Sequence, residues 1–513
     1  MNEYQIGVAA LLIFYTVLGV AMYVFVKKSG KRFIIAGKRL PFIVAGTMLY
    51  AQALDSNSTV GSASNAYLYG FWTGFVFPLG LALCLIVTGL WFAEPLNKMN
   101  LITLADFYYR RYRGMVEVPV SIIMMISFII LVAGNLAGGA WIIKELFVID
   151  YTVALVILTS LVLVYTFSGG LFSSAATDVV QEYPAFFAFT TAPIILLMNY
   201  GGWDYFSANI PPNFLDMSGM TDITNPDSGA LVNWASLLAL MFGDIVALDF
   251  MERIFAAESP RTAKYACYYG SVFTVIAGFG ATVLGLMAIT LYPDVEDARS
   301  VLNLIAVNNL PYIVGLFVMA GVIGAGLSTA NGGALAVSAV LGRNILHRNI
   351  LLPYERRKAA AKGWTMEQLE TDWHRLDQNL LTYARLALIP VFLICMWLAY
   401  VKPEPGIMLV LAFDVVFAGC LAPLVYGVYW KKANSWGALA SVIVGTGLRL
   451  ILQIDANSAA PVVPIPGMET LIPPIVTFIL LPIVSILTQK QEVGKWEVIG
   501  QVPTDEEVAR GYA

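Results

Sequence analysis

Long apolar segments follow one another along almost the whole chain, and they limit the fold more than any other feature. A run of about 20 apolar residues spans a bilayer, and its backbone must then satisfy its hydrogen bonds within a helix. Thirteen such runs occur, at approximately 4–26, 41–69, 71–93, 115–146, 151–168, 173–200, 231–253, 265–292, 311–342, 380–401, 406–430, 435–454 and 470–488. We therefore predict an all-α polytopic membrane protein with about 13 transmembrane helices.

Composition supports this class and excludes others. Charged residues make up 12% of the chain, against about 25% in soluble domains. No basic face of domain size is present, so we expect no nucleic-acid partner. The four cysteines are far apart in or beside apolar runs, and their spacing indicates neither disulfides nor a metal site. No nucleophile–base pair or cofactor-binding loop is evident, so we expect no enzyme.

The distribution of lysine and arginine predicts the orientation. If the N-terminus is outside, 26 of the 30 basic residues fall on one side of the membrane. The other side then holds only Lys144, Arg299, Lys402 and Arg449. Because cytoplasmic loops are enriched in basic residues, we expect a plasma-membrane protein with a cytoplasmic C-terminus.

The second apolar segment carries consecutive polar residues near its middle: Asp55, Ser56, Asn57, Ser58 and Thr59. Such side chains compete with helical backbone bonds. We therefore expect this stretch to unwind and expose carbonyls that bind a cation, as broken helices do in transporters. A polar helix face buried against a neighbour would give the same pattern.

Two further segments carry oxygen-bearing side chains. Asp178 follows the helix break at Gly169 and Gly170. Its carboxylate either takes part in ion coupling or stabilises the helix start by interacting with the helix dipole. Ser328 and Thr329 occupy adjacent helical positions, in a stretch whose small residues also favour close helix packing.

Acids also occur in two later segments. Asp244 lies in mid-segment and Asp414 in the outer half of its segment. Ionisable residues inside spans are expensive and often functional. Asp249 is one turn before Arg253, which favours a structural pair.

Three stretches together resemble the sodium:solute symporter family, over roughly residues 4–490. They are Thr177-Asp178-Val179-Val180-Gln181, Leu327-Ser328-Thr329-Ala330 and the segment 252–264. The resemblance implies a LeuT-like fold of two inverted five-helix repeats. Its expected parts are an extra N-terminal helix and inner loop (1–40), a first repeat (41–200), an outer loop (201–230), a second repeat (231–430) with an inner loop (343–379), two C-terminal helices (431–490) and a tail (491–513).

The resemblance also implies sodium ligands. These are the carbonyls of Ala51, Leu54 and Ala325, the hydroxyls of Ser328 and Thr329, and the carboxylate of Asp178. A second sodium in relatives uses hydroxyls just after the serine–threonine pair. Gly332 offers no such oxygen here, which argues against a second ion.

The cargo prediction rests on the acids. By the same alignment, Asp55, Asn57, Ser58, Asp244 and Asp414 are expected to bind substrate. We expect no basic residue beside them at mid-depth, so a cationic organic amine (a diamine or polyamine, a quaternary amine or a basic amino acid) is favoured. A symporter for a zwitterionic amino acid, sugar or monocarboxylate, a proton-coupled carrier and a solute sensor without net transport remain the alternatives.

Overall fold

The computed structural model describes residues 2–225, 229–354, 357, 373–458, 461–489 and 496–503. Every regular secondary-structure element among these residues is a helix. One isolated parallel β-bridge joins Leu40 to Ala257. The predicted all-α class is confirmed.

Ten helices of the described residues, with their short extensions, are long and apolar enough to cross a membrane. They are α1 (Glu3–Ala21), α6 (Phe71–Val87), α9 (Gly114–Phe147), α10 (Tyr151–Gly169), α11 (Leu171–Asn199), α17 (Pro260–Leu291), α19 (Tyr312–Ala339), α22 (Trp373–Val401), α25 (Ser435–Ala456) and α26 (Met468–Leu487).

Three other apolar segments are broken into two helices each. α4 (Phe42–Ala53) and α5 (Ser56–Tyr69) meet at Leu54 and Asp55. α15 (Ala230–Leu238) continues through a π turn, η3 (Ala239–Gly243), and a 3-10 turn, η4 (Asp244–Val246), into α16 (Leu248–Ala256), with a bend of 46°. α23 (Pro405–Gly419) and α24 (Leu421–Tyr429) are bent by 48°.

Short helices connect the long ones. They are α2 (Tyr23–Val26), α3 (Gly30–Ile35), η1 (Thr88–Phe92), α7 (Ala93–Lys98), α8 (Leu104–Tyr112), α12 (Trp203–Ser207), α13 (Pro212–Leu215), α14 (Ser218–Thr221), η5 (Ala298–Ser300), α18 (Val301–Asn308), η6 (Val340–Leu351) and η7 (Trp496–Val498). η6 continues the helix to Leu351, into the predicted inner loop 343–379, and residues 355–356 and 358–372 of that loop lie outside the described residues.

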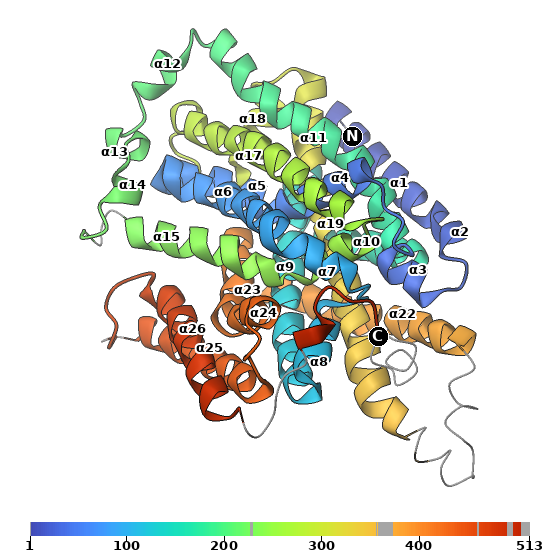
Figure 1. Cartoon of the computed structure of the whole chain (residues 1–513). Coiled ribbons are helices and arrows are strands. Elements are labelled where there is room, and N and C mark those ends of the chain that lie inside the picture. Colours follow the sequence, from blue (N-terminus) through green and yellow to red (C-terminus); the bar gives the residue numbers. More distant parts are fainter. Residues whose placement is uncertain are drawn as a thin grey trace.

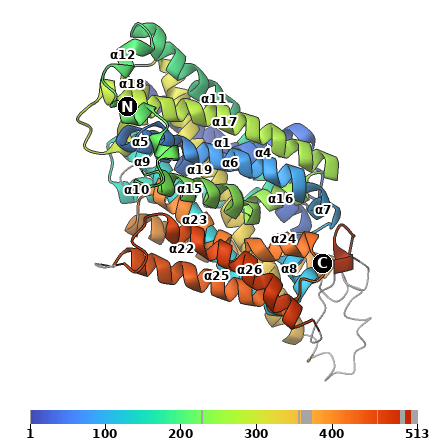
Figure 2. The ribbon, with the colours of Figure 1, turned by 60° about the vertical axis from the view of Figure 1, so that its left-hand side comes forward.

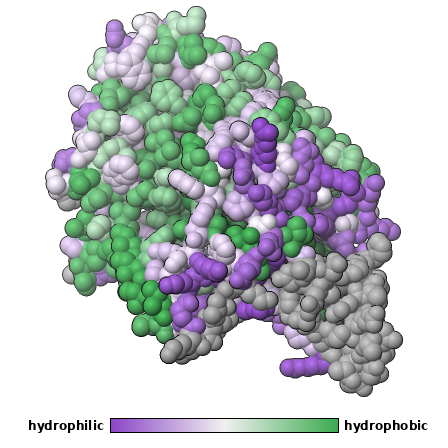
Figure 3. All heavy atoms as spheres, in the orientation of Figure 1, coloured by the Kyte–Doolittle hydropathy of each residue, from purple (hydrophilic) through white to green (hydrophobic). Residues whose placement is uncertain are grey.

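The two chain ends lie at opposite ends of the helix bundle (Figures 1 and 2). The N-terminus is beside α18, where Tyr4 Oη donates to the Ala306 carbonyl, and the C-terminus is beside α7 and α8. Hydrophobic residues cover much of the surface between these ends in Figure 3, and hydrophilic residues gather toward the end with α7 and α8. Large apolar side chains such as Ile13 on α1 and Ile475 on α26 are 64% and 60% exposed, as expected for a surface in contact with lipid.

The broken helix α4–α5 lies deep in the bundle, where glycines allow close approach. A Cβ at Gly285 of α17 would come within 2.2 Å of the Ala63 carbonyl oxygen of α5. A Cβ at Gly134 of α9 would come within 2.4 Å of Asn57 Oδ1. Small residues therefore bring α9 and α17 against the polar part of α5, as is common between membrane helices.

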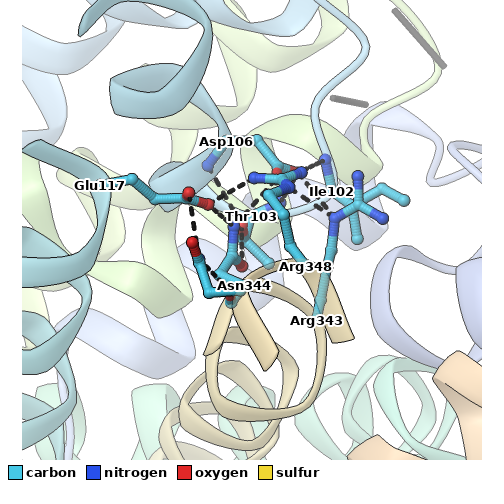
Figure 4. A network of polar contacts seen from close by, with 8 residues as sticks. Ile102, Thr103, Asp106, Glu117, Arg343, Asn344 and Arg348 are labelled. Carbon is cyan, nitrogen blue, oxygen red and sulfur yellow. Dashed lines mark hydrogen bonds and ion pairs between the residues drawn. The ribbon is translucent and has the colours of Figure 1, made fainter. Parts of the chain in front are cut away.

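A buried ion-pair network ties α8 to α9 and η6 (Figure 4). We call it the α8 network, and its members are Thr103, Asp106, Glu117, Arg343, Asn344 and Arg348. Asp106 accepts from Arg348 Nη2 at 2.6 Å and from Arg343 Nε at 3.0 Å, and Arg348 also pairs with Glu117. Burial opposes ionisation of Asp106, but the charges of Arg343 and Arg348 outweigh it and lower the pKa of this carboxyl below its usual range.

Candidate functional site

The break between α4 and α5 is shorter than the sequence predicted. Only Leu54 and Asp55 leave the helix, whereas Ser56 to Thr59 form the first turn of α5. Asp55 caps that turn, because its Oδ1 accepts from the Ser58 amide at 2.7 Å. The expected unwinding of 56–59 was therefore wrong, since the carboxylate satisfies free amides at this helix start.

The end of α4 brings free carbonyls against α19. The last four carbonyls of a helix have no intrahelical donor, and in α4 these include Ala51, while Leu54 follows as the C-cap residue. Thr329 Oγ1 donates to the Ala51 carbonyl at 3.3 Å. Ser328 Oγ lies 3.0 Å from the Gln52 side chain. The structure thus brings residues of two distant segments together, as the proposed ligand set requires.

Leu54 and Ala325, the remaining carbonyl ligands of the prediction, are 1% and 2% exposed. A Cβ at Gly326, next to Ala325, would lie 2.9 Å from Ser56 Oγ at the start of α5. This stretch of α19 therefore packs directly against the break. The oxygens available here are neutral carbonyls and hydroxyls, which suit a hard monovalent cation.

Asp178 on α11 reaches the same region through hydrogen bonds. Its Oδ2 accepts from Ser174 Oγ at 2.9 Å, and Ser174 Oγ accepts from Arg253 Nη2 at 2.9 Å. Asp178 Oδ1 has no hydrogen-bond partner among the described residues. Asp178 also interacts with the side chain of Ser328 on α19, which places this acid beside one of the predicted hydroxyl ligands.

Arg253, which the sequence analysis expected to pair with Asp249, bonds the backbone of Asp249 and pairs with the carboxylate of Glu252. It is fully buried on α16, and both distances are 3.2 Å. Arg253 thus contacts its own helix, and it also contacts Ser174 of α11. The sequence placed Arg253 at the inner end of its segment and could not show that the side chain turns inward. The expectation that no basic residue lies beside the predicted substrate acids is wrong at Asp414, which pairs with Arg449.

Asp55, Asn57 and Ser58 lie together at the start of α5, and a residue that the sequence analysis missed bonds Asp55 and Ser56 in this turn. Asn135 of α9 donates to Asp55 Oδ2 at 2.5 Å, and its Oδ1 accepts from the Ser56 amide at 3.1 Å. Asn57 Oδ1 and Ser58 Oγ have no hydrogen-bond partner among the described residues. An asparagine within a 34-residue apolar helix was the signal that could have identified Asn135.

Asp244 lies at the second break, where η3 meets η4, and it is fully buried. Neither of its carboxylate oxygens has a hydrogen-bond partner within the described part of the chain. Each of the two broken helices thus carries a buried acid at its break, Asp55 at the first and Asp244 at the second.

Asp414 faces elsewhere. It pairs with Arg449 of α25, whose Nε lies 2.6 Å from Asp414 Oδ2, and it accepts from Thr470 of α26 at 3.0 Å. Arg449, which the sequence placed near the outer side, is 4% exposed. These contacts turn Asp414 toward the two C-terminal helices rather than toward the substrate face that we expected.

The model of one protein family matches residues 33–345 and 369–445, and its description is the sodium:solute symporter family. The chain belongs to the sodium:solute symporter family. This confirms the resemblance read from residues 177–181 and 327–330. The family implies sodium as the coupling ion and a small-molecule substrate.

Curated relatives of this symporter agree over most of its length. The sodium/pantothenate symporter of Escherichia coli is 26% identical over 478 residues, which cover 90% of this chain and 94% of that protein. The high-affinity proline transporter PutP of Bacillus subtilis is 25% identical over 471 residues, 86% and 92% of the two chains. The chain is thus a multi-pass membrane protein of a sodium-coupled symporter class.

Solved structures support the same fold. A Na+-coupled sialic acid symporter in a substrate-bound outward-open state aligns with a TM-score of 0.77 and 16% identity, covering 97% of this chain and 99% of the other. Mhp1, a nucleobase-cation-symport-1 family transporter, aligns with a TM-score of 0.51 and 11% identity, covering 89% and 92%. The predicted LeuT-like class is therefore confirmed.

Proposed function

We propose that this symporter imports a small organic solute that carries a protonated amine, driven by the sodium gradient. The single observation that carries the cargo class is the pair Asp55 and Asp244. Both are buried at helix breaks, and neither carboxylate oxygen of Asp244 has a hydrogen-bond partner among the described residues. A buried charge without a partner is costly, and an opposite charge nearby offsets the cost.

The sodium site that we propose comprises the carbonyls of Ala51, Leu54 and Ala325 with the hydroxyls of Ser328 and Thr329. The 3.3 Å contact between Thr329 Oγ1 and the Ala51 carbonyl supports it, because two neutral oxygens that face each other can share a cation. Asp178 contributes negative charge from α11 through its unbonded Oδ1.

Substrate-binding roles are proposed for Asp55, Asn57, Ser58 and Asp244. Asp414 fits this role less well, since Arg449 and Thr470 already use its Oδ2. We also propose that the chain lies in the plasma membrane with its N-terminus outside. The opposite positions of the two termini in Figure 2 and the basic-residue distribution support this orientation.

Uptake by purified protein in proteoliposomes tests the proposal. Amines, proline, pantothenate and sialic acid would each be supplied in sodium and in potassium buffers. We expect sodium-dependent uptake of an amine, and its loss in Asp55→Asn. Sodium-dependent uptake of the other solutes with no response to amines would refute the cargo class, and uptake indifferent to sodium would refute the coupling.

A further inference from the structure

Gln52, near the end of α4, contacts side chains of two other helices, α16 and α19. It lies between Ala51 and Leu54, is 4% exposed, and belongs to none of the predicted ligand sets. Its amide can be placed in two orientations. In one of them Nε2 donates to Asp249 Oδ2 at 3.0 Å, and Oε1 accepts from Arg253 Nη2 at 3.2 Å and from Ser328 Oγ at 3.0 Å.

The opposite orientation is unfavourable. It would direct the amide NH2 of Gln52 at the Arg253 guanidinium, and the amide oxygen at the Asp249 carboxylate. The hydrogen-bond network is what assigns an amide. The network around Gln52 therefore selects the orientation in which Oε1 faces Ser328.

This orientation decides what the Ser328 hydroxyl offers to an ion. A serine hydroxyl has one O–H donor and two lone pairs. When the O–H is donated to Gln52 Oε1, both lone pairs remain available, and one can bind a cation. Groups that orient a metal ligand in this way commonly tune the affinity of the site.

Gln52 also links the ion site to the inner half of the second broken helix. Asp249 and Arg253 belong to α16, which begins after the 46° bend. The backbone of α19 leaves room for this contact, since a Cβ at Gly332 would lie 2.3 Å from Arg253 Nη2. Through one amide, α4, α16 and α19 share a hydrogen-bond network.

We propose that Gln52 is a positioning residue of the sodium site, which orients the Ser328 hydroxyl toward the ion and joins ion binding to the position of α16. The inference rests on the proposed sodium site. An ion shifts a conformational equilibrium only through contacts that differ between states, and the proposal is that the contact of this amide with α16 is one of them.

Radioactive sodium binding to the purified full chain is the direct test. Gln52→Met keeps a side chain of similar length without hydrogen bonds, and we expect about tenfold weaker sodium binding, or about 1.4 kcal/mol. Ser328→Ala should weaken binding as well, and Gln52→Met should add little in that background, because both changes remove one interaction. Gln453→Met is the matched control, since Gln453 also accepts from an arginine, Arg449, but on α25.

A second variant keeps the test decisive if Gln52→Met folds poorly. Gln52→Glu retains the oxygens that face Ser328 and Arg253 but loses the donor to Asp249. We expect its sodium affinity to be no weaker than that of the wild type, while its maximal uptake rate falls.

Three results would each overturn the inference. The first is equal sodium affinity in Gln52→Met and the wild type, and the second is additive losses of sodium affinity in the double variant with Ser328→Ala. The third is an equal loss of sodium affinity in Gln52→Glu and Gln52→Met. Wild-type protein that binds no sodium would refute the proposed sodium site itself, and this inference with it.

Discussion

Replacing Arg348 by glutamine should lower the free energy of unfolding by more than the loss of an exposed ion pair would. Arg348 pairs with two fully buried carboxylates, Asp106 and Glu117. The variant leaves Asp106 with Arg343 and Asn344, and leaves Glu117 with Asn344 at 2.7 Å. Removing one partner of a buried ion pair costs about 3–5 kcal/mol, because the remaining charge is uncompensated.

Lys402→Gln is the matched control. Lys402 and Glu404 form an ion pair whose side chains are 55% and 41% exposed. Such pairs contribute about 0–1 kcal/mol. Each variant would be heated in detergent, and size-exclusion chromatography would then measure the folded protein that remains. The remaining fraction ranks the variants by heat resistance. Equal heat resistance of Arg348→Gln and Lys402→Gln would refute the reasoning.

The pH dependence has a definite sign. The pKa of Asp106 is lowered in the folded protein, so its ionisation stabilises the fold above the unfolded value of about 3.9. That contribution is lost as the pH falls through the folded pKa. In Arg348→Gln, Asp106 keeps Arg343 but Glu117 loses its arginine partner. Protonation then relieves the less compensated buried charge, so the deficit relative to the wild type should shrink as the pH falls from about 7 to about 5. A deficit that grows with acidity would contradict the ion-pair argument.

Three further changes test other parts of the structure. Thr329→Ala removes a proposed ligand and should raise the sodium concentration for half-maximal uptake about tenfold or more, whereas an unchanged value would exclude this hydroxyl from the site. Asp414→Asn should lower the free energy of unfolding by about 3 kcal/mol, because Arg449 loses its charge partner. It should not change which solutes are carried, and an altered solute preference would restore Asp414 as a substrate ligand. Gly285→Val should abolish folded protein in a fluorescence-detected chromatography assay, since a Cβ there meets a backbone oxygen at 2.2 Å. Gly447→Ala, with nothing within 4 Å of its Cβ, should behave as the wild type, and equal yields would refute the packing argument.

The helical segments follow from the sequence because the bilayer permits so few alternatives. A long apolar run in lipid must be a helix, and each predicted segment corresponds to a long helix or to a broken pair. The break at Asp55 was found for the right reason, since polar residues compete for backbone bonds. Its length was overestimated, because the Asp55 side chain caps α5 and keeps Ser56 to Thr59 helical.

Side-chain partners were decided by tertiary structure alone. Nothing in the sequence indicates that Asn135 bonds Asp55 across 80 positions, or that Arg449 turns toward Asp414. The distance along the chain carries no information about which helix faces which. Charged side chains near segment ends can also turn inward, as Arg253 does.

The sequence by itself determined the membrane class, the series of apolar segments and the family, because each rests on local composition or on short motifs. The tertiary structure decided which acids are compensated and which remain without a partner. That distinction depends on helix packing, which places Arg449 beside Asp414 but places no hydrogen-bond partner, among the described residues, at Asp244. It also placed Gln52 between Ser328 and Asp249, because only packing brings α4, α16 and α19 within hydrogen-bonding distance of one amide.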